Sequence, residues 1–222
     1  MKYSILLFLT FFFDNALCQS GYFEGTMTYS NREFDKNGRE MPTPVTKERY
    51  FLTRNVILVK TLAGPIILAI GKVDVYLNAT ENVKYSIDHD NEVIKKSNIS
   101  TGIQSIQPIE EYVMGEENFR GHLCELHFIK YVHLFNGPFG IVKDTVSCTY
   151  YNSVNSKVFN LKVFTALQEN RNSLLLDGRY EGLPLKVIIK RQDNSQLVIE
   201  CLEVKQMSID DFVKLPTYKF EN

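Results

Sequence analysis

The chain has 222 residues, a formal net charge of −1, 23% charged and 44% hydrophobic residues. This balance excludes a disordered tail and a basic nucleic-acid-binding protein. The length is sufficient for one large domain or two small ones, and the four cysteines are too few for a disulfide scaffold.

Residues 1–18 predict a secretory signal peptide. Lys2 precedes an apolar run from Ile5 to Phe13, and Ala16-Leu17-Cys18 follows as a cleavage pattern. The run is too short to span a bilayer. Cleavage after Cys18 would leave residues 19–222 as the mature chain, exported to the periplasm or secreted.

Cleavage before Cys18, with a lipid attached to that cysteine, is the alternative. It is less favoured because Leu17 stands where a small residue is wanted. No later stretch qualifies as a membrane span, since Lys60, Gly64 and Pro65 interrupt the apolar segment 56–70. The mature chain is therefore expected to have no integral membrane segment.

Period-2 alternation dominates the first half of the mature chain. Phe23, Met27 and Tyr29 fall on one face of a predicted strand. Residues 31–44 are charged and rich in turn signals, which predicts a loop. Further strands are predicted within 48–62, 66–78 and 83–94, as a meander of hairpins.

The pattern loosens between residues 97 and 121, where Ile109 to Met114 could form one helical turn or an irregular crossing. Beyond it, strands are predicted at 121–135, 144–152, 158–164, 183–190 and 196–206. Long amphipathic helices, internal repeats and interdomain linkers are missing from the sequence. We therefore expect a single all-β domain over residues 19–222, with few short helices.

Two of the predicted strands, 122–135 and 196–206, carry large apolar side chains on both faces. A curved antiparallel sheet with a ligand or a covering segment on its concave face would accommodate this pattern, and a closed, self-filled core is the alternative. The residues expected to bind an apolar ligand are Leu126, Phe128, Val132, Val146 and Tyr150.

Common catalytic and nucleotide-binding motifs are missing from the sequence, and no cofactor or metal ion is expected. His127 and His133 share a strand face but lie about 20 Å apart, too far to ligate one metal. Either one beside a cross-strand carboxylate would support an enzyme, although hydrogen-bonded sheet histidines are the more common case. The acidic stretch Asp88 to Glu92 is better explained as a solvated hairpin tip than as a calcium loop.

The cysteines of the mature chain are Cys124, Cys148 and Cys201. A bridge between Cys124 and Cys148 requires a register that brings their Cα atoms within about 7 Å, and buried thiols are the equal alternative. Cys201 is expected to be packed. Asn78 and Asn98 fit the glycosylation pattern, which matters only in a eukaryotic host.

Short motifs at both ends resemble an uncharacterised family of exported proteins from Gram-negative bacteria. Phe23 to Tyr29 resembles its "FEGTI-Y" start, Gly121 to Cys124 its "GY-C" step, and Gly182 to Lys186 with Asp211 to Tyr218 its "G-PL" and "F-P-Y" elements. That family is similar in fold to the LolA-like lipoprotein carriers. The resemblance implies an incomplete antiparallel barrel that binds a hydrophobic ligand or a lipoprotein.

The sequence thus supports three functions, in order. The first is a non-catalytic exported protein that binds an apolar ligand, a lipoprotein or a partner's apolar segment on a curved sheet. The second is a structural or adhesive surface protein with a self-filled core. The third is an enzyme with a histidine–carboxylate site.

Overall fold

The computed structural model describes residues 22–64, 72–99, 108–137, 140–157, 180–209 and 212–221, with backbone alone for 133–137 and 140–144. The predicted signal peptide with Cys18 and the predicted strand 158–164 lie outside the described residues, as does the side chain of His133. Export therefore stays a prediction.

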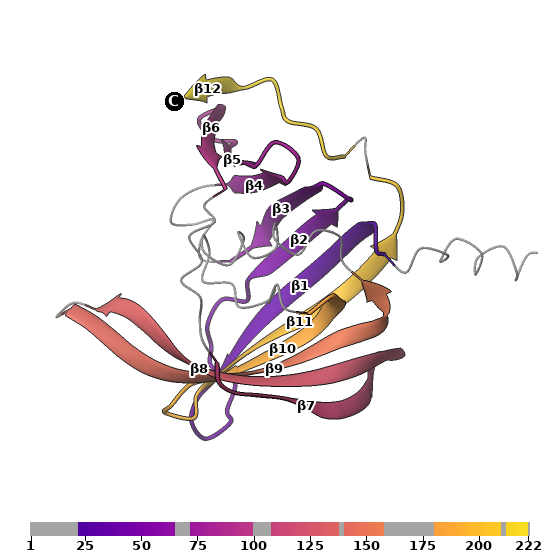
Figure 1. Cartoon of the computed structure of the whole chain (residues 1–222). Coiled ribbons are helices and arrows are strands. Elements are labelled where there is room, and N and C mark those ends of the chain that lie inside the picture. Colours follow the sequence, from indigo (N-terminus) through magenta and orange to yellow (C-terminus); the bar gives the residue numbers. More distant parts are fainter. Residues whose placement is uncertain are drawn as a thin grey trace, which may run out of the picture.

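The described residues form one sheet of twelve strands in the order β12-β6-β5-β4-β3-β2-β1-β11-β10-β9-β8-β7 (Figure 1). Neighbours pair antiparallel throughout, except β12, which runs parallel to β6. The strands are β1 (Gly25–Phe34), β2 (Lys47–Leu52), β3 (Val56–Ala63), β4 (Val73–Asn78), β5 (Val83–Asp88), β6 (Val93–Asn98), β7 (Pro108–Phe119), β8 (His122–Gly137), β9 (Gly140–Lys157), β10 (Gly182–Lys190), β11 (Gln196–Gln206) and β12 (Lys219–Glu221).

The sheet is strongly curved, and β12 and β7 lie at the two opposite ends of its strand order without pairing with each other (Figure 1). It is therefore open and not closed into a barrel. This confirms the prediction of an all-β fold with an incompletely closed antiparallel sheet. The few short helices that were expected do not occur among the described residues.

Two local predictions need correction. Residues 31–34, expected in a loop, complete β1 and pair with β11. Ile109 to Met114, left open between a helical turn and an irregular crossing, belongs to β7, which turns into β8 through Arg120 and Gly121 at φ 51° and 84°. The register of β7 shifts around Ile109 and Met114. These irregularities interrupt the period-2 alternation from which a strand is predicted.

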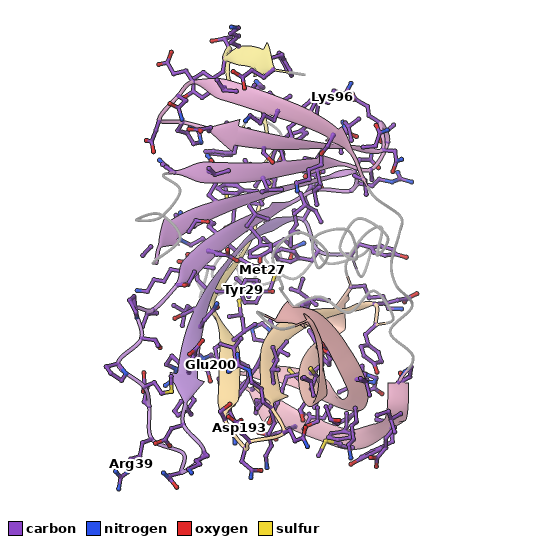
Figure 2. The ribbon with its side chains drawn as sticks, turned by 90° about the vertical axis from the view of Figure 1, so that its left-hand side faces the viewer. Met27, Tyr29, Arg39, Lys96, Asp193 and Glu200 are labelled. Carbon is purple, nitrogen blue, oxygen red and sulfur yellow. The ribbon has the colours of Figure 1, made fainter. Side chains whose placement is uncertain are left out.

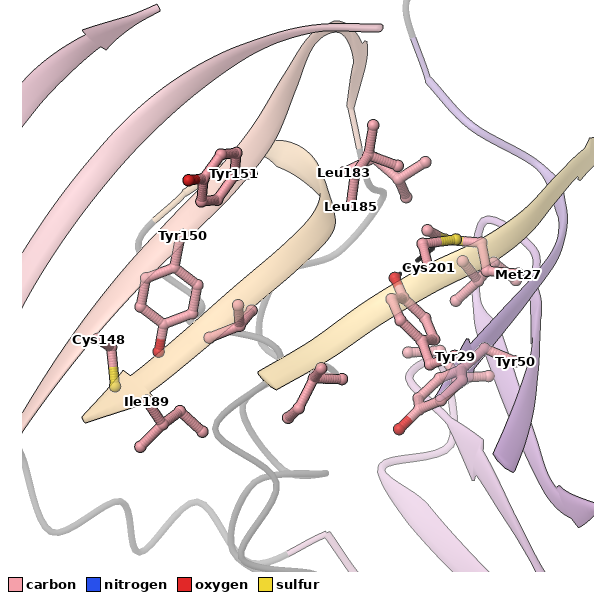
Figure 3. Close-up of a cluster of buried hydrophobic side chains, with 14 of the residues drawn as sticks. Met27, Tyr29, Tyr50, Cys148, Tyr150, Tyr151, Leu183, Leu185, Ile189 and Cys201 are labelled. Atoms are coloured by element: carbon pink, nitrogen blue, oxygen red, sulfur yellow. Dashed lines mark hydrogen bonds between the residues drawn. The ribbon is translucent and has the colours of Figure 1, made fainter. Parts of the chain in front are cut away.

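Backbone register divides the sheet into two faces, named here by one residue each. The Tyr29 face carries Met27, Tyr29 and Cys201, and Figure 3 shows these gathered with Tyr50 in the main core. The Glu200 face carries Ser30, Glu200 and Lys186 across β1, β11 and β10. Phe23, Met27 and Tyr29 are all buried in one cluster, which confirms the face predicted for the first strand.

The same Glu200 face is apolar over β2 to β6, where the chain after β11 covers it. Ile209 and Val213 are buried there against side chains of the strands beneath, in a second core with Phe51, Leu58, Tyr76, Val83, Tyr85, Ile87 and Ile94. In Figure 2, Lys96 of β6 lies toward the top of the molecule and Asp193 of the β10–β11 hairpin lies toward the bottom. Over β8 to β11 this face carries polar and charged residues, such as Lys130, Ser147 and Lys190, beside apolar ones such as Phe128 and Val198.

Candidate binding site at the free edge of the sheet

Strand β7 lies at one end of the sheet and, among the described residues, pairs only with β8 (Figure 1). It is twelve residues long, and eleven of these residues are exposed. Within the described part of the chain, one row of its backbone N–H and C=O groups therefore has no neighbouring strand. Such an edge is a template on which another extended chain can pair.

Four large apolar side chains of β7 are exposed together. Ile109, Tyr112, Val113 and Met114 are 59%, 47%, 56% and 53% exposed. The Tyr112 ring stacks on Phe128 of β8, with centroids 4.9 Å apart. Exposed apolar side chains along a strand edge are surface that an added strand would contact.

The same strand is acidic. Glu110, Glu111, Glu116 and Glu117 are all exposed, so they form a solvated acidic surface. By register, Glu111, Val113 and Glu116 share the Tyr29 face, and Glu110, Tyr112 and Glu117 share the Glu200 face. Both faces of the edge thus present apolar groups beside carboxylates.

A cavity of about 290 Å³ lies beside this edge on the Tyr29 face. Its floor holds His127, whose Nε2 lies 2.6 Å from Oε2 of Glu125. The two residues are two positions apart on β8, so they share a face. This is a histidine–carboxylate pair of the kind considered in the sequence, with the carboxylate on the histidine's own strand.

Tyr180 forms one wall of this cavity. Its ring lies against the His127 ring at a centroid distance of 3.9 Å. Its hydroxyl donates to Oε1 of Glu111 at 2.8 Å, so it connects β7 to the cavity. At the rim, Lys157 Nζ lies 2.7 Å from Glu181 Oε2.

Asn152 lines the cavity and is 4% exposed. Its Nδ2 has no hydrogen-bond partner among the described residues, although buried amide groups are normally paired. A Cβ on Gly182 would lie 2.8 Å from Cβ of Asn152, so only glycine fits at that position. The register slips on both sides of Pro184, and the resulting bulge in β9 makes room for the cavity.

Neither the Asn152 donor nor the Tyr180 wall carried a signal in the sequence. Tyr180 lies outside every predicted strand, and Asn152 is the last residue of the strand predicted at 144–152. His127 could be found because it is one of four histidines and lies on a strongly alternating strand.

The residues expected to bind an apolar ligand are divided between the faces. Leu126 and Phe128 lie with Val132 on the Glu200 face, since Leu126 pairs with Tyr151 and Phe128 with Thr149. Val146 and Tyr150 lie on the Tyr29 face and are buried in the main core, to which the buried Leu126 also belongs. The register does not bring the five side chains together on one surface.

The register also fails the condition for a Cys124–Cys148 bridge. Cys124 pairs with Ser153, whereas Cys148 pairs with Ile129, so the two side chains lie on opposite faces. Both are buried thiols outside any disulfide bond, as is Cys201. Burial raises the pKa of the Cys201 thiol to about 11, in keeping with the packed role expected for it.

The remaining predicted positions lie in turns and strand ends. Asn78 Oδ1 accepts the N–H groups of Thr80 and Glu81 in the β4–β5 turn, and Asn98 is exposed at the end of β6. Asp88 Oδ1 accepts from Asp90 and Asn91, so the acidic stretch is a hairpin tip as expected. Its His89, in contrast, reaches Asp74 and Tyr218, which the sequence did not indicate.

Within the described ranges, no group of three or more His, Cys, Asp or Glu side chains is arranged to hold a metal ion. The same residues include no helix with the length and apolarity to cross a membrane.

No family model matches the chain, and no curated protein matches it. Among solved structures it is similar to PNGF-II, with 14% identity, a TM-score of 0.45 and 89% of this chain covered. The match covers 31% of that protein, so the chain spans about a third of its length.

Two further solved structures match over most of their own length. One is a putative outer membrane lipoprotein-sorting protein domain from Vibrio parahaemolyticus, with 8% identity, a TM-score of 0.33, and 89% of this chain and 94% of that chain covered. The other is LprF from Mycobacterium bovis, with 6% identity, a TM-score of 0.32, and coverage of 86% and 92%. The family resemblance inferred from the sequence motifs stays a prediction.

Proposed function

We propose that this protein binds an extended apolar segment of a partner protein along β7, as an added strand of the sheet. The observation that carries the proposal is the exposed edge of β7, where apolar side chains lie and beside which the described residues place no further strand. It corresponds to the partner-segment form of the binding function inferred from the sequence.

The length of β7 supports this function. Twelve residues of strand extend over about 40 Å, enough for several main-chain hydrogen bonds to an incoming strand. In strand addition these bonds supply affinity, and pockets for alternate side chains supply specificity. The patch of Ile109, Tyr112, Val113 and Met114 gives such a strand apolar surface to cover.

The negative charge of β7 favours a partner segment that carries basic residues. The four carboxylates of β7 have one cation in register with them, Lys130 of β8 opposite Glu110. An incoming strand that alternates apolar and basic residues would pair with this edge, and an acidic one would be repelled.

The test uses a labelled twelve-residue peptide that alternates valine and lysine, followed by fluorescence anisotropy. We expect it to bind and to slow hydrogen exchange of β7 amides. A copy with alternate backbone nitrogens methylated keeps every side chain and charge but loses strand pairing, so it should bind at least about tenfold more weakly. Equal binding of the two peptides would contradict strand addition.

A matched pair of variants locates the site. Val113→Asn removes apolar contact from the exposed edge without changing its charge and should weaken peptide binding. Leu202→Asn makes the same change at a 41% exposed residue of β11, which has strands on both sides, and should leave binding unchanged.

Catalysis at His127 is a second candidate function, favoured by its hydrogen-bonded carboxylate and by the cavity that both residues line. Glu125 would orient the imidazole, and the imidazole would act as a general base on a bound water. The corresponding test is a panel of ester and glycoside substrates with native protein and His127→Gln. Equal turnover by both would remove this candidate.

A further inference from the structure

A second hollow, of about 440 Å³, lies on the Glu200 face near the β10–β11 hairpin. It is separate from the His127 cavity, which opens on the Tyr29 face. Its lining consists of hydroxyl, amide and cationic side chains: Lys130, Thr145, Ser147, Lys190, Arg191 and Gln192.

Sheet register explains why these groups meet. Lys130 of β8 pairs with Ser147 of β9, and Ser147 pairs with Lys190 of β10. The three therefore form one row across three strands, with all side chains on the same face. The two lysine Cα atoms are about 9.6 Å apart, twice the spacing of neighbouring strands. Two flexible ammonium groups at this distance can both reach a small anion bound over Ser147.

The positive charge of this row is not neutralised by the described part of the chain. Among the described side chains, no carboxylate lines the hollow, and no carboxylate oxygen lies within 4.0 Å of the Lys130 or Lys190 nitrogen. Glu110 is opposite Lys130 in register but makes no ion pair with it. Asp193 lies in the adjacent hairpin, where it accepts the Ser195 N–H at 2.9 Å.

Other cations on the same face are arranged differently. Arg32, Arg120 and Lys186 all converge on the Glu200 carboxylate, at 2.9, 3.7 and 3.6 Å. These three cations share a carboxylate partner, whereas Lys130 and Lys190 have none among the described residues. Uncompensated like charges facing one hollow destabilise the folded state unless an anion binds between them.

We propose that this hollow binds a phosphate-type oxyanion. Lys130 and Lys190 supply charge from two sides, Ser147 and Thr145 supply hydroxyl donors from the floor, and Arg191 at the rim supplies a planar pair of donors. Charge-assisted hydrogen bonds of this kind are the strong ones in phosphate recognition. The site is independent of strand addition at β7.

The experiment titrates the protein with inorganic phosphate and, separately, with phosphatidylcholine vesicles that contain phosphatidic acid. Amide chemical shifts of Ser147 and Lys190 report the first titration, and co-sedimentation reports the second. Binding of phosphate identifies a free oxyanion as the ligand, and binding of the vesicles alone identifies a lipid headgroup.

Substitutions decide whether the row is responsible. We expect Lys130→Ala and Lys190→Ala each to weaken binding about tenfold, the effect of one lost charge-assisted bond. Ser147→Glu places a carboxylate in the centre of the hollow and should abolish binding. Lys47→Ala, the same change at an exposed lysine of β2, should leave it unaltered.

Thermal unfolding midpoints within the native range identify folded variants, and the exposed position of Lys190 makes folding of Lys190→Ala the expected result. The proposal is overturned if neither probe binds the native protein, or if Lys130→Ala, Lys190→Ala and Ser147→Glu bind like Lys47→Ala.

Discussion

The hydroxyl of Tyr29 donates a hydrogen bond of 2.7 Å to the main-chain oxygen of Pro184, which is 155 positions away in the sequence. Tyr29 belongs to β1 and Pro184 to β10, and β11 lies between them. The register of β10 with β9 slips on both sides of Pro184, so the tyrosine satisfies a carbonyl at an irregular point of the ladder. Burial raises the pKa of Tyr29 well above its ordinary value.

The first prediction concerns this bond. Tyr29→Phe leaves the buried Pro184 oxygen without its donor and should lower the free energy of unfolding by about 1–3 kcal/mol. Urea unfolding followed by circular dichroism measures the loss. Tyr85→Phe removes a hydroxyl that bonds Glu81 at 3.3 Å in a partly buried position and should cost about 0.5 kcal/mol. Equal losses in the two variants would contradict the assignment.

The second prediction concerns the attachment of the chain after β11. His89 Nε2 lies 2.8 Å from Asp74 Oδ2, and His89 Nδ1 lies 3.2 Å from the Tyr218 hydroxyl. Asp74 is buried, and its Oδ1 has no partner among the described residues. His89→Ala should therefore cost about 2 kcal/mol, because it leaves a buried carboxylate without its main partner.

Limited proteolysis provides the structural readout for this variant. Loss of the Tyr218 contact should expose residues 207–218 to cleavage before the rest of the chain. Asp74→Asn combined with His89→Ala should be less destabilised than the sum of the single changes, since the buried charge is gone. Lys95→Ala, which breaks an exposed ion pair with Glu221, is the control and should change stability by less than about 0.5 kcal/mol.

The third prediction concerns alkaline pH. The folded state keeps the Cys201 thiol protonated up to a pKa of about 11, whereas the ordinary thiol value is 9.0. Between these two values the unfolded chain binds fewer protons than the folded one. The free energy of unfolding should therefore fall as pH rises through this interval, by about 1.4 kcal/mol per pH unit from this thiol.

Urea unfolding at a series of pH values from about 8 to 11 measures the slope. Cys201→Ala loses packing by an amount that does not depend on pH, and it has no thiol to titrate. Its free energy of unfolding should therefore fall less steeply over the same interval. Parallel slopes for the native protein and the variant would rule out this contribution.

The fourth prediction compares a glycine required only by its positive φ with one required also by a close backbone contact. Gly121 has φ 84° with no atom within 4 Å of an added Cβ, so Gly121→Ala should cost only the backbone strain, about 1 kcal/mol. Gly25 has φ 151°, and its added Cβ would overlap the Lys205 carbonyl oxygen. Gly25→Ala should cost about 3 kcal/mol because two neighbouring strands must also move apart. Denaturant midpoints compare the two, and a larger loss for Gly121→Ala would be inconsistent with this account.

The candidate site could be predicted from the sequence only in part. His127 was identified from strand alternation. The strand character of β7 was hidden, because the bulges near Ile109 and Met114 interrupt the alternation on which the prediction relied. Asn152 and Tyr180 belong to no recognisable sequence motif. They become part of the site only because the fold places them beside His127 in the cavity.

By itself the sequence determined the all-β class, the approximate extents of most strands and the face on which Phe23, Met27 and Tyr29 lie. These properties depend on the two-residue period of an extended chain, which is local. Tertiary structure decided that β7 is the free edge, that Leu126 and Tyr150 face opposite sides, and that His89 meets Asp74. These depend on strand order and register, and a one-residue change of register exchanges the two faces of a strand without altering its sequence.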